Sequence, residues 1–291
     1  MMSAELRARV LVAAVGIPLA FLLIRLGGWY LAGLMAVAAA LAAKEFLDLA
    51  AAGGGRPLRW LGIPAASALV VLAGLEPGFA AWGDRALALL VVVGLAASCS
   101  VTAAGGIDRA PLLSAAATVS GVVYTGGTLS FVVLLRHLPE TQGAVAAHPW
   151  EGTLLVSLPL AVTWVGDTAA YFVGKRMGKR PLAPRVSPNK TIEGGVAGLI
   201  AAPATGALMG VFLQGLPNFP VSPLAGAAVG LVLGAGAQLG DLAESVLKRE
   251  AGVKDSGALL PGHGGVLDRF DALFFTIPLG YGLILLARHL P

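Results

Sequence analysis

The sequence consists mainly of long apolar runs separated by short polar stretches. A membrane-spanning helix needs about 20 mostly apolar residues, and nine segments meet or approach that length. These segments are residues 10–24, 29–43, 61–75, 86–104, 112–135, 153–173, 194–213, 223–240 and 270–287. The pattern therefore predicts an all-α, polytopic integral membrane protein with about nine transmembrane helices.

The composition supports this prediction. Hydrophobic residues make up 57% of the chain and charged residues only 12%, whereas a soluble domain carries about 25% charged residues. A single cysteine excludes a disulfide scaffold and a cysteine-based metal cluster. The sequence pI is about 9.5, but the basic residues lie in short loops with few aromatic neighbours, so we expect no nucleic-acid partner.

The basic residues also predict an orientation. Membrane proteins keep most Lys and Arg of their short loops on the cytoplasmic side. With a cytoplasmic N-terminus, the nine segments leave only four basic residues outside, namely Arg25, Arg85, Arg136 and Arg288. A cleaved signal peptide is disfavoured because no small-residue cleavage site follows the first apolar segment. We therefore expect a multi-pass protein of the cell inner (plasma) membrane.

Two loops are long and rich in polar side chains, residues 174–193 and 241–269, and both are predicted to be cytoplasmic. Residues 1–150 contain about five of the predicted spans. Residues 151–291 contain about four spans and both loops. We therefore expect the catalytic transmembrane region in residues 151–291, with its site on the cytoplasmic side.

The second loop begins with Asp241, Glu244, Ser245 and Lys248, at positions i, i+3, i+4 and i+7. If the preceding helix continues past Gly240, all four residues lie on one face of it. The alternative is a solvated helix end with a Glu244–Lys248 pair. That alternative does not explain why an acidic residue directly follows a long apolar run.

The same loop continues with a glycine-rich turn, residues 261–265, and a new helix begins just after it. Backbone N–H groups of such a turn, together with a helix N-terminus, form an anion site suited to phosphate. Asp268 and Asp271 follow, three residues apart, with Arg269 between them. Either acid alone is typical of a helix cap, but the pair at a membrane boundary favours a metal site.

The other loop is preceded by Asp167, a carboxylate within an apolar segment, which indicates a functional site. The basic residues at 175–180 are typical of anchoring beside anionic lipid headgroups. The hydroxyl-rich, basic stretch at 187–191 is predicted to be a turn that opens the seventh helix, with Glu193 in its first turn. Phosphate binding and plain helix capping both fit this stretch.

Two blocks of sequence resemble a known family. From Ser245 to Asp271 the chain has S-V-L-K-R, then K-D, then P-x-H-G-G-x-x-D-R-x-D, which resembles the signature of phosphatidate cytidylyltransferases (CDP-diacylglycerol synthases). Residues 167–194 look like a second block of that family, D-T-A-A-Y-F-V-G-K-R-M-G-K followed by V-S-P-N-K-T-x-E-G. The first five predicted spans resemble the family only in hydropathy.

The resemblance implies that CTP and phosphatidic acid react to give CDP-diacylglycerol and pyrophosphate at the cytoplasmic membrane face, with Mg²⁺. It also implies a homodimer and a metal between Asp241 and Asp268, with Asp271 nearby as a third metal candidate; whether a second cation binds stays open. The candidate catalytic residues are Asp241, Lys248, Arg249, Lys254, Asp255, His263, Asp268, Arg269 and Asp271. The candidate substrate-binding residues are Asp167, Ser187, Asn189, Lys190, Thr191, Glu244, Ser245, Gly264 and Gly265.

Three alternatives differ from this assignment. A CTP-dependent kinase or a CDP-archaeol-type synthase of similar architecture belongs to the same broad class, and the reaction type could then be kept while the lipid differs. A secondary transporter would use Asp167 and Asp241 as ion-coupling carboxylates. The sequence shows no paired halves of the kind that transporters usually have, and the motif of CDP-alcohol phosphotransferases is absent.

Overall fold

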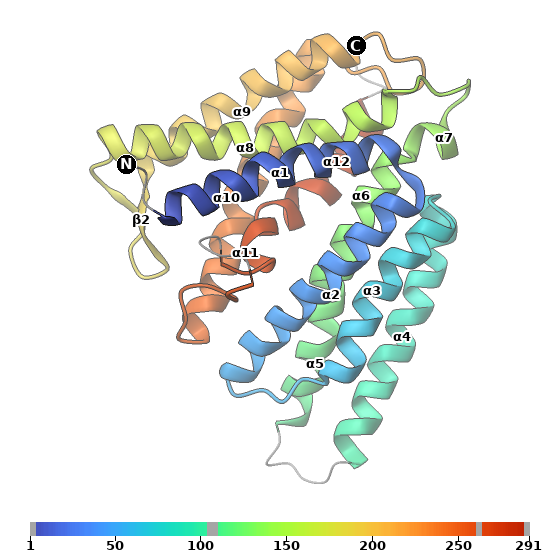
Figure 1. Ribbon diagram of the computed structural model, residues 1–291, viewed down its shortest axis with the longest axis vertical. Helices are drawn as coiled ribbons and strands as arrows, with labels where there is room; N and C mark the ends of the chain where they lie inside the picture. Colours follow the sequence, from blue (N-terminus) through green and yellow to red (C-terminus); the bar gives the residue numbers. More distant parts are fainter. Residues whose placement is uncertain (1–3, 104–109, 260–263, 288–291) are drawn as a thin grey trace. The chain divides into compact units, whose positions relative to one another are not determined.

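The computed structural model describes residues 4–103, 110–259 and 264–287, without side chains for residues 4–13 and 15 (Figure 1). The chain divides into two compact parts, and each is discontinuous in sequence. The first part comprises residues 1–134 and 247–270, and the second comprises residues 135–246 and 271–291. This division follows the packing of the chain and does not test the predicted catalytic region at residues 151–291, which stays a prediction.

The regular elements described in the first part are all helices, joined by loops. Its elements are α1 (Ala4–Leu26), α2 (Gly28–Ala52), α3 (Arg59–Leu75), α4 (Phe79–Ala103), α5 (Pro111–Gly121), the π-helix η2 (Val122–Gly127), most of α6 (Thr128–Arg136), the end of α10 (Pro223–Glu250), and α11 (Leu267–Phe270). Leu47 and Leu69 are fully buried in its core. A Cβ on Gly62 would lie 2.8 Å from Cδ1 of Leu47, so glycine allows α3 to approach α2 closely.

The second part contains the longest helices. Its elements are α7 (Leu138–Gln142), α8 (Glu151–Met177), β1 (Pro181–Ala183), β2 (Ser187–Thr191), α9 (Ile192–Leu213), α10 (Pro223–Glu250, as far as Val246) and α12 (Leu273–Ala287). Gly206 of α9 faces Gly226 of α10, and Gly230 of α10 faces Ala202 of α9. A side chain at any of these glycines would collide with the facing backbone, which explains why small residues occur here within apolar helices.

Strands β1 and β2 form an antiparallel hairpin between α8 and α9, with Pro181 paired to Thr191 and Ala183 paired to Ser187. The prediction of a turn at 187–191 was therefore wrong, because these residues are extended and pair with β1. The capping interpretation is confirmed for Thr191, whose Oγ1 accepts a hydrogen bond of 3.2 Å from the N–H of Gly194. The hairpin is a small exception to an otherwise helical fold.

Six helical stretches among the described residues are long and apolar enough to cross a membrane. They are Phe79–Ala103, Pro111–Arg136, Glu151–Met177, Ile192–Leu213, Pro223–Glu250 and Leu267–Ala287. Gly16–Leu26 and Arg59–Leu75 are shorter apolar helices. Helix α2 has sufficient length but carries Lys44, Glu45 and Asp48. The structure is that of a multi-pass membrane protein, while the count of nine spans and the orientation remain predictions.

Candidate active site

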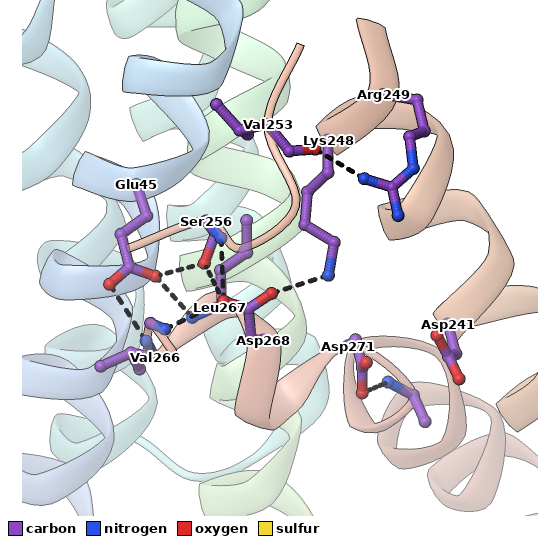
Figure 2. A network of polar contacts seen from close by, with 12 residues as sticks. Glu45, Asp241, Lys248, Arg249, Val253, Ser256, Val266, Leu267, Asp268 and Asp271 are labelled. Carbon is purple, nitrogen blue, oxygen red and sulfur yellow. Dashed lines mark hydrogen bonds and ion pairs between the residues drawn. The ribbon is translucent and has the colours of Figure 1, made fainter. Parts of the chain in front are cut away.

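Asp268 lies in the short helix α11 of the first part and is 7% exposed. Its Oδ1 accepts a hydrogen bond of 2.7 Å from Nζ of Lys248, which forms a buried ion pair. Its Oδ2 accepts bonds from the N–H of Ser256 at 2.8 Å and from the N–H of Gly265 at 2.9 Å (Figure 2). These donors hold the carboxylate in a single orientation.

A second buried carboxylate, that of Glu45 in α2, belongs to the same network (Figure 2). Its Oε1 accepts a bond of 3.0 Å from the N–H of Val266, and its Oε2 accepts one of 2.7 Å from the N–H of Leu267. The hydroxyl of Ser256 lies 2.9 Å from Oε2 of Glu45 and 2.9 Å from Oδ2 of Asp268. The sequence pattern did not predict a functional role for Glu45.

Glycines make room for both carboxylates. Gly264 has a φ of +77°, and a Cβ there would lie 2.7 Å from Oδ2 of Asp268. A Cβ on Gly257 would lie 2.7 Å from Oε1 of Glu45, and one on Gly265 would collide with the same carboxylate. Among the described residues of the glycine-rich turn, the N–H of Gly265 donates to Asp268 of the protein itself and is not open to a phosphate, so phosphate binding by the turn stays a prediction.

The predicted face of α10 is partly confirmed. The helix runs unbroken from Pro223 to Glu250 and therefore includes Asp241, Glu244, Ser245 and Lys248. Glu244 is fully buried, and Ser245 and Lys248 are 8% and 9% exposed. A solvated helix end, the alternative raised by the sequence, does not describe these residues.

Asp241 and Asp271 both belong to the second part. Asp241 forms an ion pair with Nζ of Lys190, the last residue but one of β2. A Cβ on Gly240 would lie 2.9 Å from the carbonyl oxygen of Asp271 and 2.7 Å from Phe275, so α10 lies directly against this segment. Oδ1 of Asp271 accepts a bond of 2.7 Å from the N–H of Ala272. The two carboxylates thus lie on neighbouring segments (Figure 2).

The other predicted site residues are more exposed. Arg249 is exposed, and its Nη1 donates to the carbonyl oxygen of Val253 at 2.8 Å, which ties the end of α10 to the following loop. Lys254, Asp255 and Arg269 are also exposed. His263 lies outside the described residues, so its predicted role is neither supported nor opposed.

Asp167 lies within α8 and is exposed on that helix. Ser187 and Asn189 are on β2, with Asn189 exposed. Glu193, at the start of α9, accepts bonds from the N–H groups of Lys179 at 3.0 Å and Arg180 at 3.3 Å. These bonds fasten the hairpin that carries Lys190 to the N-terminus of α9.

Neither part contains, among its described residues, three His, Cys, Asp or Glu side chains grouped so that they alone could hold a metal ion. The predicted metal ligands divide between the parts, with Asp268 in the first and Asp241 and Asp271 in the second. A magnesium ion also takes substrate phosphates and water as ligands, so the absence of such a group does not bear on the predicted metal site.

Comparisons with known proteins agree with the resemblance. A sequence model of the Cytidylyltransferase family matches residues 7–287. The phosphatidate cytidylyltransferase of Synechocystis sp. is 34% identical over 294 residues, which covers 96% of each chain. The phosphatidate cytidylyltransferase of Bacillus subtilis is 38% identical over 164 residues, or 56% of each chain. That of Staphylococcus aureus is 48% identical over 129 residues, covering 44% of this chain and 48% of the relative. The chain therefore belongs to the Cytidylyltransferase family.

Proposed function

We propose that the protein is a membrane-embedded enzyme that transfers the cytidylyl group of CTP to phosphatidic acid, giving CDP-diacylglycerol and pyrophosphate. The observation that carries this proposal is the similarity to a phosphatidate cytidylyltransferase over 96% of both chains. The site adds support, because acidic and basic side chains gather around residues 241–271 and in the hairpin at 181–191.

The reaction joins two anions. A phosphate oxygen of phosphatidic acid attacks the α-phosphorus of CTP, and the bond from that phosphorus to the bridging oxygen of the β-phosphate breaks. Pyrophosphate leaves with that oxygen. The attacking oxygen is already ionised near pH 7, so no strong general base is required, and the protein acts through positioning and charge neutralisation. Lys190 and the exposed Arg249, Lys254 and Arg269 are cations that can serve this purpose, whereas the buried Lys248 acts through its ion pair with Asp268.

The predicted ligands fit Mg²⁺, which prefers a few carboxylate oxygens together with substrate phosphates and water. Oδ2 of Asp268 receives its hydrogen bonds from Ser256 and Gly265, whereas Oδ1 receives the one from Lys248 and retains acceptor capacity. The side chain of Asp241 is 30% exposed and therefore accessible to a hydrated ion. We propose that Asp241, Asp268 and Asp271 hold the metal, with a second cation left open. When bound, Mg²⁺ neutralises phosphate charge in the transition state and on the leaving pyrophosphate.

The proposal also includes the location, the orientation and the oligomeric state of the enzyme. Both reactive loops face the cytoplasm, nine helices cross the inner (plasma) membrane, and the enzyme is a homodimer. Phosphatidic acid then remains in the bilayer and presents its headgroup to the hairpin and to residues 241–271. The distribution of basic residues supports the orientation, and the apolar helices support the membrane location.

The test is a reaction with purified protein in detergent. CTP, phosphatidic acid and Mg²⁺ are supplied together, and both CDP-diacylglycerol and pyrophosphate are measured. We expect equal amounts of the two products, and none when EDTA is added or when either substrate is omitted. Turnover with another lipid acceptor in place of phosphatidic acid would contradict the proposed substrate. A folded protein that consumes no CTP with any lipid would overturn the enzyme assignment.

A further inference from the structure

We propose that Glu45 is a positioning residue of this enzyme: its carboxylate fixes Ser256 and the backbone of residues 265–267, and through them it fixes Asp268. The inference rests on the proposed function for its effect on turnover. Glu45 lies outside both sequence blocks that carry the family resemblance, because it belongs to α2, within the first predicted spans. All the residues involved belong to the first part of the chain.

The contacts of Glu45 go to the backbone of the segment that it holds. Oε1 accepts from the N–H of Val266 at 3.0 Å, and Oε2 accepts from the N–H of Leu267 at 2.7 Å. These N–H groups lie at the start of α11, where a helix has no internal acceptor for them. Glu45 belongs to a helix far away in the sequence, and it supplies the acceptors that a local capping side chain normally provides.

Only a carboxylate of this length satisfies both donors. Glu45 is 6% exposed, so a buried N–H group that lost its partner would have no water in its place. Glutamine has the same size but a single acceptor oxygen, and its NH₂ group would face one of the N–H donors. Aspartate keeps the charge but is one methylene shorter. Both substitutions should loosen the start of α11 without removing a side chain that contacts substrate.

The geometry connects Glu45 to Asp268 through Ser256. The hydroxyl of Ser256 lies 2.9 Å from an oxygen of each carboxylate and has one proton to donate. Adjacent N–H groups are divided between the two acids, with Gly265 bonded to Asp268 and Val266 and Leu267 bonded to Glu45. A shift of the segment at Glu45 therefore changes the orientation of the Asp268 carboxylate.

The glycines of the segment agree with this role. A Cβ on Gly257 would lie 2.7 Å from Oε1 of Glu45, and one on Gly265 would collide with Oε2. Both glycines have φ outside the left-handed region, so conformation does not require them. The close approach of the Glu45 carboxylate explains instead why these two positions have no side chain.

The chain offers a matched control in Glu151, the first residue of α8 in the second part. Glu151 is fully buried and accepts bonds of 2.9 Å from the N–H groups of Asn218 and Phe219. It is the same residue type and also holds a loop, with these two N–H groups on Oε1 and the N–H of His148 on Oε2 at 3.3 Å, so a glutamine NH₂ group there would again face a donor. None of the candidate site residues takes part in its contacts. Glu151→Gln therefore reproduces the chemical change without touching the network of Asp268.

The experiment compares Glu45→Gln, Glu45→Asp and Glu151→Gln in full-length protein in detergent, by hydrogen–deuterium exchange and steady-state kinetics. We expect Glu45→Gln to speed exchange at residues 256–259 and 264–268 and to lower kcat by about 10- to 100-fold, as for other residues that orient a metal ligand. The KM for CTP should stay unchanged, and Glu45→Asp should restore part of kcat. Glu151→Gln should speed exchange at 218–219 and leave kcat unchanged.

Two results would overturn the inference: wild-type exchange at residues 256–259 and 264–268 in Glu45→Gln, or a kcat equal to that of the wild type. If Glu45→Gln does not fold, Ser256→Ala tests the same connection, because it removes the shared hydroxyl and keeps the bonds of Glu45 to the backbone. A wild-type kcat in Ser256→Ala would then contradict the inference. If the wild type makes no CDP-diacylglycerol, the proposed function fails, and the exchange data still decide whether Glu45 fixes the segment.

Discussion

Asp268 and Asp241 are both predicted metal ligands, but their surroundings differ. The side chain of Asp268 is 5% exposed and paired with Lys248, which is 11% exposed. The side chain of Asp241 is 30% exposed and paired with Lys190, which is 29% exposed. Asp268 also accepts hydrogen bonds from Ser256 and Gly265. The Asp268 carboxylate is therefore buried and held in one orientation, whereas the Asp241 carboxylate is accessible to solvent and solutes.

The difference suggests a division of labour. A carboxylate with several fixed donors keeps its orientation through a reaction, and this is the preorganisation that electrostatic catalysis requires. An accessible ion pair exchanges its partner at little cost, because exposed pairs contribute about 0–1 kcal/mol. Under the proposed function, Asp268 sets the geometry of the site, while Lys190 is free to move from Asp241 to an incoming phosphate.

The largest effect is expected for Asp268→Asn. The substitution removes the negative charge opposite Lys248 and turns an NH₂ group toward donors of the loop. We expect CDP-diacylglycerol formation to fall by about 10²- to 10³-fold or more, with the protein still expressed and folded. The rate and the melting temperature in detergent are measured together. Turnover equal to that of the wild type would contradict the assignment of Asp268 as a metal ligand.

Lys248→Met should mainly lower stability. Methionine fills a similar volume but leaves the buried carboxylate of Asp268 without its cation, and removing one partner of a buried pair costs about 3–5 kcal/mol. We expect a loss near the lower end, because Ser256 and Gly265 still donate to the carboxylate. Unfolding of the variant in a denaturing detergent series measures this loss. An unchanged unfolding midpoint would show that the pair contributes nothing to stability.

Lys190→Ala separates activity from stability. The pair with Asp241 is partly exposed, so its loss should cost less than about 1 kcal/mol of stability. Activity should fall by about tenfold through the loss of one charge-assisted contact to phosphate. Kinetics at varied CTP and phosphatidic acid identify which substrate loses affinity. If stability falls and activity does not, Lys190 supports the structure of the hairpin and does not bind substrate.

The smallest effect is expected for Asp48→Asn, which also serves as a control for Asp268→Asn. Asp48 accepts from Lys44 at 2.9 Å and from Arg59 at 2.6 Å on an exposed face of α2. Removing these exposed pairs should change stability by less than about 1 kcal/mol and leave turnover unchanged. A large loss of activity would indicate that the ion pairs of this face also support catalysis.

The sequence predicted the helices better than the polar network. Apolar length alone located the helices around each of the nine predicted segments, because helices in a membrane must satisfy their backbone internally. The face of α10 from Asp241 to Lys248 also followed from helical spacing. The hairpin at 181–191 was missed, since two short strands joined by a turn have no apolar periodicity.

Glu45 was missed for a physical reason. It lies between Lys44 and Asp48, and that cluster of charges is typical of a helix end that faces solvent. A signal was nevertheless present, because Glu45 falls on the same stripe as the buried residues Ala38, Ala42 and Leu49. Its partners in the loop lie more than 200 residues further along the chain, as for Val266 at a separation of 221. Spacing within one helix does not reveal such a partner.

The most direct test of the proposed reaction follows the label of CTP into the lipid. Purified protein is given phosphatidic acid, Mg²⁺ and CTP labelled with ³²P at either the α- or the γ-phosphate, and the lipid and aqueous fractions are counted. Cytidylyl transfer predicts lipid label from α-labelled CTP only, with the γ-label recovered in pyrophosphate. Lipid label from γ-labelled CTP would instead show a CTP-dependent kinase and contradict the proposed function.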